Sequence, residues 1–131
     1  MIKNLILVLL LLPSVVLTQY KNIKVNSISN NPEEVSIAIN PRHPNNLVAG
    51  ANINNYYYSF DGGITWVNKE ISDSKNGVWG DPVLIFDNNG AAYFFHLSRP
   101  SNSQWIDRIV CQKSTDGGMT YEDPGTYMGL N

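Results

Sequence analysis

The chain has 131 residues, of which 43% are hydrophobic and 15% charged, and its formal net charge at neutral pH is −2. This length is typical of a single domain. The weakly acidic balance excludes the basic stripe that a nucleic-acid-binding surface requires. Cys111 is the single cysteine, so an internal disulfide is excluded and a packing role for its side chain is favoured.

Residues 1–18 have the pattern of a secretory signal peptide. Lys3 precedes an unbroken apolar run, Leu5–Leu12, which is too short to span a bilayer comfortably. We expect cleavage after Thr18, which leaves a mature chain with 8 basic and 11 acidic residues and no further membrane span. The predicted location is therefore secreted, extracellular or periplasmic. An uncleaved anchor or a buried strand is the alternative for this run.

The rest of the chain alternates short β-branched and aromatic segments with clusters of Asn, Gly, Pro and Asp. No stretch keeps a helical period, so the sequence predicts an all-β fold. The spacing predicts two four-stranded antiparallel meanders. Their expected strands are 35–40, 47–52, 56–60 and 64–71 in the first, and 82–87, 91–97, 106–113 and 119–121 in the second.

One eight-residue segment occurs twice, as SFDGGITW at 59–66 and as STDGGMTY at 114–121. Each part of it suits a tight turn: the glycines accept a positive φ, the Asp accepts hydrogen bonds from turn amides, and the hydroxyls tie the arms together. The final aromatic side chain packs on neighbouring strands. The predicted structural residues are Ser59, Asp61, Gly63, Thr65 and Trp66 in the first copy, and Ser114, Asp116, Gly118, Thr120 and Tyr121 in the second.

The two copies lie 55 residues apart, and a repeat of about fifty residues with four strands and one fixed turn is typical of a β-propeller blade. The expected division is a lead-in at 19–31, blade 1 at 32–79 and blade 2 at 80–131. Propellers close with about four to eight blades, so two blades form an incomplete propeller. We expect the N-terminal part of a longer protein or, as the alternative, self-association, in which three copies would supply six blades.

The repeated segment resembles the Asp-box, or bacterial neuraminidase repeat, of the sialidase superfamily and other β-propellers. The flanking stretches 36–52 and 80–95 are similar to blades of secreted sialidase-like proteins, and the resemblance covers nearly all of residues 32–125. It implies a propeller that acts on or binds extracellular glycans or glycoproteins. Asp-boxes also occur in other glycosidases, in receptors and in propellers without catalysis.

In this family a sialidase uses three arginines, a Tyr–Glu pair and an acid/base Asp. The chain holds Arg42, Arg99 and Arg108, none of them in the Arg-Ile-Pro motif that the family places ahead of the first Asp-box. The resemblance therefore implies a mainly structural scaffold rather than an exo-sialidase active by itself. A non-catalytic adhesion or receptor propeller and a fragment of an active glycoside hydrolase are the two alternatives.

Four side chains are candidates for chemistry. Asp81, in WGDP, stands at the start of a first strand as a candidate catalytic or metal-binding carboxylate, although a turn-capping role before Pro82 is favoured. Tyr57, His96 and Arg99 are candidate binding residues, with core packing as the alternative for the first two. The two histidines lie too far apart in sequence to form a metal site alone, so no metal or other cofactor is predicted.

Overall fold

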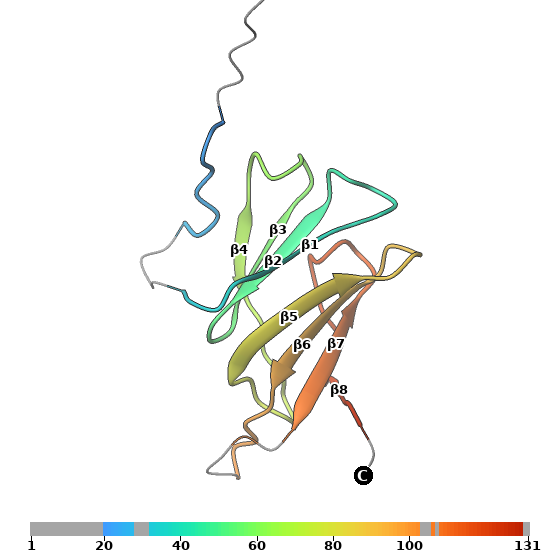
Figure 1. The fold of residues 1–131 in the computed structure, drawn as a ribbon. Helices are drawn as coiled ribbons and strands as arrows, with labels where there is room; N and C mark the ends of the chain where they lie inside the picture. The colour runs from blue at the N-terminus through green and yellow to red at the C-terminus, as the bar shows by residue number, and fades with distance from the viewer. Residues whose placement is uncertain (1–19, 28–31, 103–105, 107, 130–131) are drawn as a thin grey trace, which may run out of the picture.

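The computed structural model describes residues 20–27, 32–102, 106 and 108–129, and all eight regular elements in these ranges are strands (Figure 1). The predicted signal peptide, 1–18, lies outside the described residues. Within the described ranges no helix has the length and apolar character to cross a membrane.

The strands form two separate four-stranded sheets, each an antiparallel meander in chain order. Sheet 1 contains β1 (Ser36–Ile39), β2 (Leu47–Ala51), β3 (Asn55–Ser59) and β4 (Val67–Glu70). Sheet 2 contains β5 (Gly80–Phe86), β6 (Ala92–Leu97), β7 (Ile109–Ser114) and β8 (Thr126–Tyr127). The prediction of an all-β fold with two such meanders is confirmed; neither sheet closes on itself among the described residues.

The first turn of each sheet is built around a side-chain oxygen at the same position of the repeat. The Asn40 Oδ1 atom accepts the N–H of Arg42 at 2.9 Å, and the Asp87 Oδ1 atom accepts the N–H of Asn89 at 2.8 Å. Such Asx turns satisfy backbone donors that a strand ladder cannot reach. They end β1 and β5 and send the chain back into β2 and β6.

The predicted fourth strand began too early in sheet 1 and was misplaced in sheet 2. In sheet 1, residues 64–66 belong to the turn, and β4 starts only at Val67. In sheet 2, residues 119–121 are also turn, and β8 lies at Thr126–Tyr127. The intervening segment has one backbone bond to β7, from Glu122 to Lys113, and is otherwise held by side chains: Gln112 donates to the carbonyl of Glu122 at 2.6 Å, and Gly125 donates to Asp73 at 2.8 Å.

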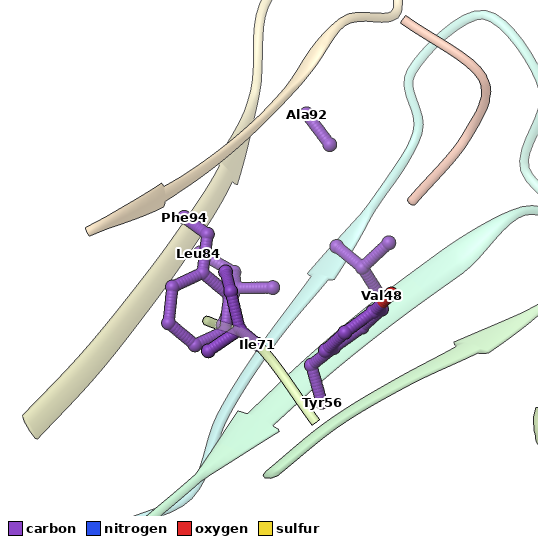
Figure 2. Close-up of a cluster of buried hydrophobic side chains, with 6 residues drawn as sticks. All are labelled: Val48, Tyr56, Ile71, Leu84, Ala92 and Phe94. Atoms are coloured by element: carbon purple, nitrogen blue, oxygen red, sulfur yellow. The ribbon is translucent and has the colours of Figure 1, made fainter. Parts of the chain in front are cut away.

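The hydrophobic core lies between the two sheets (Figure 2). Val48 and Tyr56 of sheet 1 face Leu84 and Phe94 of sheet 2, and Val48 and Phe94 are fully buried. Gly50 allows this close approach, because a Cβ atom there would lie 2.9 Å from the Phe94 ring and 2.7 Å from Leu84. Burial of this apolar surface is the main force that holds the sheets together.

Successive sheets stack in the same orientation. Ile37, Ala49 and Tyr57 form one row across the first three strands of sheet 1, and Leu84, Phe94 and Gln112 form the equivalent row in sheet 2. The row in sheet 1 points away from sheet 2, whereas the row in sheet 2 points toward sheet 1. Each sheet therefore has a different inner and outer face, and the two sheets are related as successive members of a stack.

Candidate functional site

The first repeated segment, box 1 (59–66), is a turn locked by side-chain hydrogen bonds. The Asp61 carboxylate accepts three: from the Ser59 hydroxyl at 2.8 Å, from the Thr65 N–H at 2.9 Å and from the Thr65 hydroxyl at 2.6 Å. Ser59 in turn accepts the N–H of Gly63 at 3.0 Å. These bonds, with those from Thr65 making the largest contribution, lower the pKa of Asp61 to about 2.

The second repeated segment, box 2 (114–121), has the same four hydrogen bonds. Asp116 accepts from the Ser114 hydroxyl at 2.8 Å, from the Thr120 N–H at 2.9 Å and from the Thr120 hydroxyl at 2.5 Å. Burial opposes ionisation of Asp116, but the bonds from Thr120 and Ser114 outweigh it and hold the pKa of this carboxyl below its usual range. Both carboxylates are thus ionised hydrogen-bond acceptors in turns, not proton donors poised for catalysis.

The surroundings of the two boxes differ. Box 2 rests on sheet 1: the Asn46 amide donates to the carbonyl of Gly117 at 2.9 Å, and the Tyr56 hydroxyl and the Lys69 ammonium donate to the carbonyl of Met119 at 3.2 and 2.8 Å. The corresponding bonds of box 1 stay within sheet 1: Gly62 donates to the carbonyl of Asn45, and the Asn46 amide donates to the carbonyl of Ser59 at 3.2 Å. Box 2 therefore fastens the two sheets to each other.

A cavity of about 780 Å³ opens where box 2 meets the first turns of both sheets. Its wall contains one cationic side chain, one carboxylate and several amides, together with apolar side chains. The lining residues are Asn40, Arg42, His43, Pro44, Asn45, Asn46, Phe60, Asn89, Gly90, Thr115, Asp116 and Gly117. We refer to this cavity as the turn cleft.

The turn cleft offers hydrogen-bond donors and acceptors without a catalytic pair among the described residues. Asn46 and Asn40 are buried and bonded to each other at 3.0 Å, so they support the wall. Arg42, His43 and Asn45 are exposed and can meet a ligand. Asp116 is already occupied by its own turn. This set suits a polar ligand with several hydroxyl or carboxylate groups, which Arg42 can engage with its fork of donors.

At the opposite end of the strands, one acidic residue lies near the start of the first strand of each sheet. Glu34 and Asp81 occupy equivalent positions and share a left-handed backbone conformation, with φ of 52° in both. Asn52 lies between them: its amide donates to Glu34, and its Oδ1 atom accepts the N–H of Asp81 at 2.7 Å. Positive φ is uncommon for such residues and marks a backbone that its surroundings constrain.

The candidate Asp81 is exposed and joins this bridge through its main chain. The described residues contain no group of three or more His, Cys, Asp or Glu side chains placed to hold a metal ion. The carboxylate of Asp81 is thus presented to solvent beside Glu34, and its proposed chemistry stays a prediction.

The other candidates lie far from one another. Tyr57 is 2% exposed and packs with Ala49, Ala51 and Trp66 on the outer face of sheet 1, so its ring is covered. His96 is 1% exposed, with Nε2 at 3.0 Å from Gln112 Oε1, on the inner face of sheet 2. Both therefore pack as core residues in this structure.

Arg99 is exposed, and its guanidinium lies 4.2 Å from the ring centroid of Trp79. Such a cation–π contact stabilises the loop after β6. The cavity lined by Tyr57 includes none of Arg99, Asp81 and His96.

The sequence missed the turn cleft, although it contained one signal for it. Arg42 and His43 follow Asn40, and Asn89 follows Asp87, in two turns that the repeat makes equivalent. Equivalent turns of stacked sheets lie at the same end of the stack, which brings their polar side chains together. The contribution of Thr115 and Asp116 depends on how box 2 docks, which the sequence does not show.

No protein-family model matches this chain, and comparison with curated proteins and with solved structures found no significant match. The two boxes and the turn cleft are therefore the features from which a function is proposed.

Proposed function

We propose that this chain is an exported, sialidase-like Asp-box β-propeller segment, chiefly the scaffold of a glycan-binding or glycan-acting protein. The observation that supports this most directly is the pair of four-stranded meanders stacked in one orientation, each closed by the same set of Asp, Ser and Thr hydrogen bonds. Stacked meanders with a fixed turn are how propeller blades are built. In this proposal Asp61 and Asp116 are structural.

The scaffold role is tested by replacing the carboxylates of Asp61 and Asp116 in the protein that binds the glycan. Asp61→Ala and Asp116→Ala should both lower the midpoint of thermal unfolding, and Asp61→Ala, which lies outside the turn cleft, should leave the affinity for the glycan within about twofold. Loss of affinity at unchanged stability would show that the boxes bind the ligand themselves.

Within this proposal the turn cleft binds the glycan. Arg42 is its exposed cation, and the amides around it match the hydroxyl groups of a sugar. The probe is a sialylated glycoprotein, with the same glycoprotein after removal of its sialic acid as the comparison. Arg42→Ala should weaken binding to the sialylated form at least tenfold, because a bidentate charge-assisted contact contributes more than about 1.4 kcal/mol.

Lys75→Ala is the matched control, since it removes one exposed positive charge outside the turn cleft. Equal losses for both variants would reduce the effect to net charge and contradict the assignment of the cleft. Binding that survives desialylation unchanged would exclude the sialic acid carboxylate as the group that Arg42 recognises.

A non-catalytic adhesion or receptor role is the second candidate, and the chemistry of the cleft favours it over hydrolysis. Asp116 is held ionised by its turn, and no second carboxylate lines the cavity among the residues that the structure describes. A fluorogenic sialoside should therefore be bound without turnover. Turnover that Asp81→Asn abolishes would instead move the active site to the opposite end of the strands.

A further inference from the structure

The outer face of sheet 2 is a broad apolar surface. Side chains that point away from sheet 1 come from three adjacent strands and include Val83 on β5, Phe95 on β6 and Ile109 on β7. Val83 and Ile109 are about half exposed, at 52% and 49%. An apolar patch of this kind on a folded protein marks an interaction surface.

The repeat identifies which positions of sheet 1 correspond to this face. Gly50 pairs with Ser36 and Tyr56, and Phe95 pairs with Val83 and Cys111 in the same register. Phe95 is therefore the equivalent of Gly50. In the same way Ala49 is the equivalent of Phe94.

Within one chain, Gly50 of sheet 1 packs directly against side chains of sheet 2, which leave no room for a side chain at this position. A Cβ atom on Gly50 would lie 2.7 Å from Leu84, 2.9 Å from Phe94 and 3.1 Å from Pro82. The contact between the sheets thus combines an absent side chain on one sheet with a large ring on the other.

On the outer face of sheet 1, the corresponding three residues surround an empty space. Val35, Ile37 and Ala49 take the places of Pro82, Leu84 and Phe94. Together with the lead-in, which packs on this face through Val25, they line a cavity of about 220 Å³ whose exposed wall is almost entirely apolar. The small side chain of Ala49 leaves this cavity unfilled, whereas the ring of Phe94 fills the equivalent position of sheet 2. The size order of the pair is reversed: Gly50 meets Phe94 within the chain, whereas Phe95 and Ala49 lie on the two outer faces.

We infer that a second copy of this chain covers the outer face of sheet 2, with Phe95 of one copy entering the cavity formed by Val35, Ile37 and Ala49 of the next. The contact repeats the packing of sheet 2 on sheet 1, with the ring supplied from the opposite side. It is heterologous, since it joins two different faces, and it therefore continues from copy to copy until a ring closes.

The exposure of β1 on the outer face of sheet 1 agrees with the inferred contact between copies. Ile37 is 60% exposed and its neighbour on the same face, Ile39, is 59% exposed, so an apolar ridge along β1 is free to be covered. The inference rests on the packing of the sheets and not on the proposed glycan function, and either can fail without the other.

The first experiment measures the mass of the purified chain by sedimentation velocity over a range of concentrations. We expect species larger than one chain that dissociate on dilution. A monomer at every concentration up to the solubility limit overturns the inference.

The second experiment uses one variant for each face. Phe95→Lys blocks the outer face of sheet 2, and Ile37→Glu blocks the outer face of sheet 1; each should be monomeric by itself. When mixed, the two variants keep one intact face each, so they should form a 1:1 dimer and nothing larger. Val83→Lys replaces Phe95→Lys if the latter lowers the unfolding midpoint.

Ile64→Lys is the matched control, because Ile64 is an exposed isoleucine in box 1 on neither face. It should associate like the unmodified chain. Association that persists in Phe95→Lys and Val83→Lys, or a mixture that stays monomeric, overturns the inference.

Discussion

Box 1 and box 2 have the same sequence pattern and the same four hydrogen bonds among their Ser, Asp, Gly and Thr residues, yet they occupy different surroundings. A Cβ atom added to Gly63 of box 1 would have the Trp66 ring as its nearest neighbour, at an ordinary contact distance of 3.5 Å. A Cβ atom added to the equivalent Gly118 would overlap the side chain of Val48 in the other sheet. The pattern Ser-x-Asp-Gly-Gly-x-Thr therefore specifies a turn, and the neighbouring sheet decides whether that turn also holds the molecule together.

The largest expected difference between the boxes comes from these two glycines. Both have positive φ, 85° at Gly63 and 91° at Gly118, so alanine costs about 1 kcal/mol at either position through backbone strain. At Gly118 the overlap with Val48 adds about 2 kcal/mol. Urea unfolding should give a loss of about 3 kcal/mol for Gly118→Ala and about 1 kcal/mol for Gly63→Ala. Equal losses of unfolding free energy for the two variants would contradict the proposed difference between the boxes.

A second difference concerns two neighbouring asparagines. Asn46 is buried and donates to the carbonyls of Ser59 and Gly117, which joins box 1, box 2 and the first turn. Asn46→Ala leaves these groups unsatisfied and should cost about 2 kcal/mol. Asn45→Ala removes an exposed amide and should cost less than about 0.5 kcal/mol in the same measurement. A smaller loss for Asn46→Ala would mean that the docking of box 2 needs no such bridge.

The carboxylates of the boxes predict a loss of stability in acid. The pKa of Asp61 falls from 3.8 to about 2 on folding, so its contribution is fully present above pH 4 and is lost as the pH falls through 2. Thermal unfolding should therefore show a midpoint that drops between pH 4 and pH 2. Asp61→Asn should make this drop smaller, and an unchanged drop would place the titration elsewhere.

The smallest expected effect concerns the final aromatic residue, at which substitution should destabilise box 1 more than box 2. The Trp66 indole donates to the carbonyl of Gly63 at 2.9 Å, so Trp66→Phe should cost about 1 kcal/mol. The hydroxyl of Tyr121 is buried without a hydrogen-bond partner among the described residues, and this burial raises its pKa. Tyr121→Phe should therefore change the free energy of unfolding by less than about 0.5 kcal/mol. A larger loss would reveal a partner for this hydroxyl.

The sequence predicted the fold class and the first three strands of each sheet because alternation and turn residues are local signals. The predicted fourth strand began too early in sheet 1 and was misplaced in sheet 2. Ile64 and Met119 are apolar residues of the kind found in strands, but Asp61 and Asp116 hold the adjacent backbone in a turn. Side-chain capping thus overrides strand propensity at these positions.

The site was less predictable than the fold. The turn cleft combines Arg42, Asn89 and Asp116, which are brought together only by the stacking of the sheets. The burial of Tyr57 and His96 on one face of each sheet follows from strand alternation, which the sequence shows, but which face is covered depends on the neighbouring sheet.

Native-state hydrogen exchange tests the central claim most directly, because it compares the two boxes in one molecule. The N–H of Gly63 and the N–H of Gly118 donate to equivalent hydroxyls, at 3.0 and 2.9 Å. If box 2 fastens the sheets, Gly118 should exchange only through global unfolding, whereas Gly63 should exchange faster through local opening of its turn. Equal protection of the two amides would contradict this account.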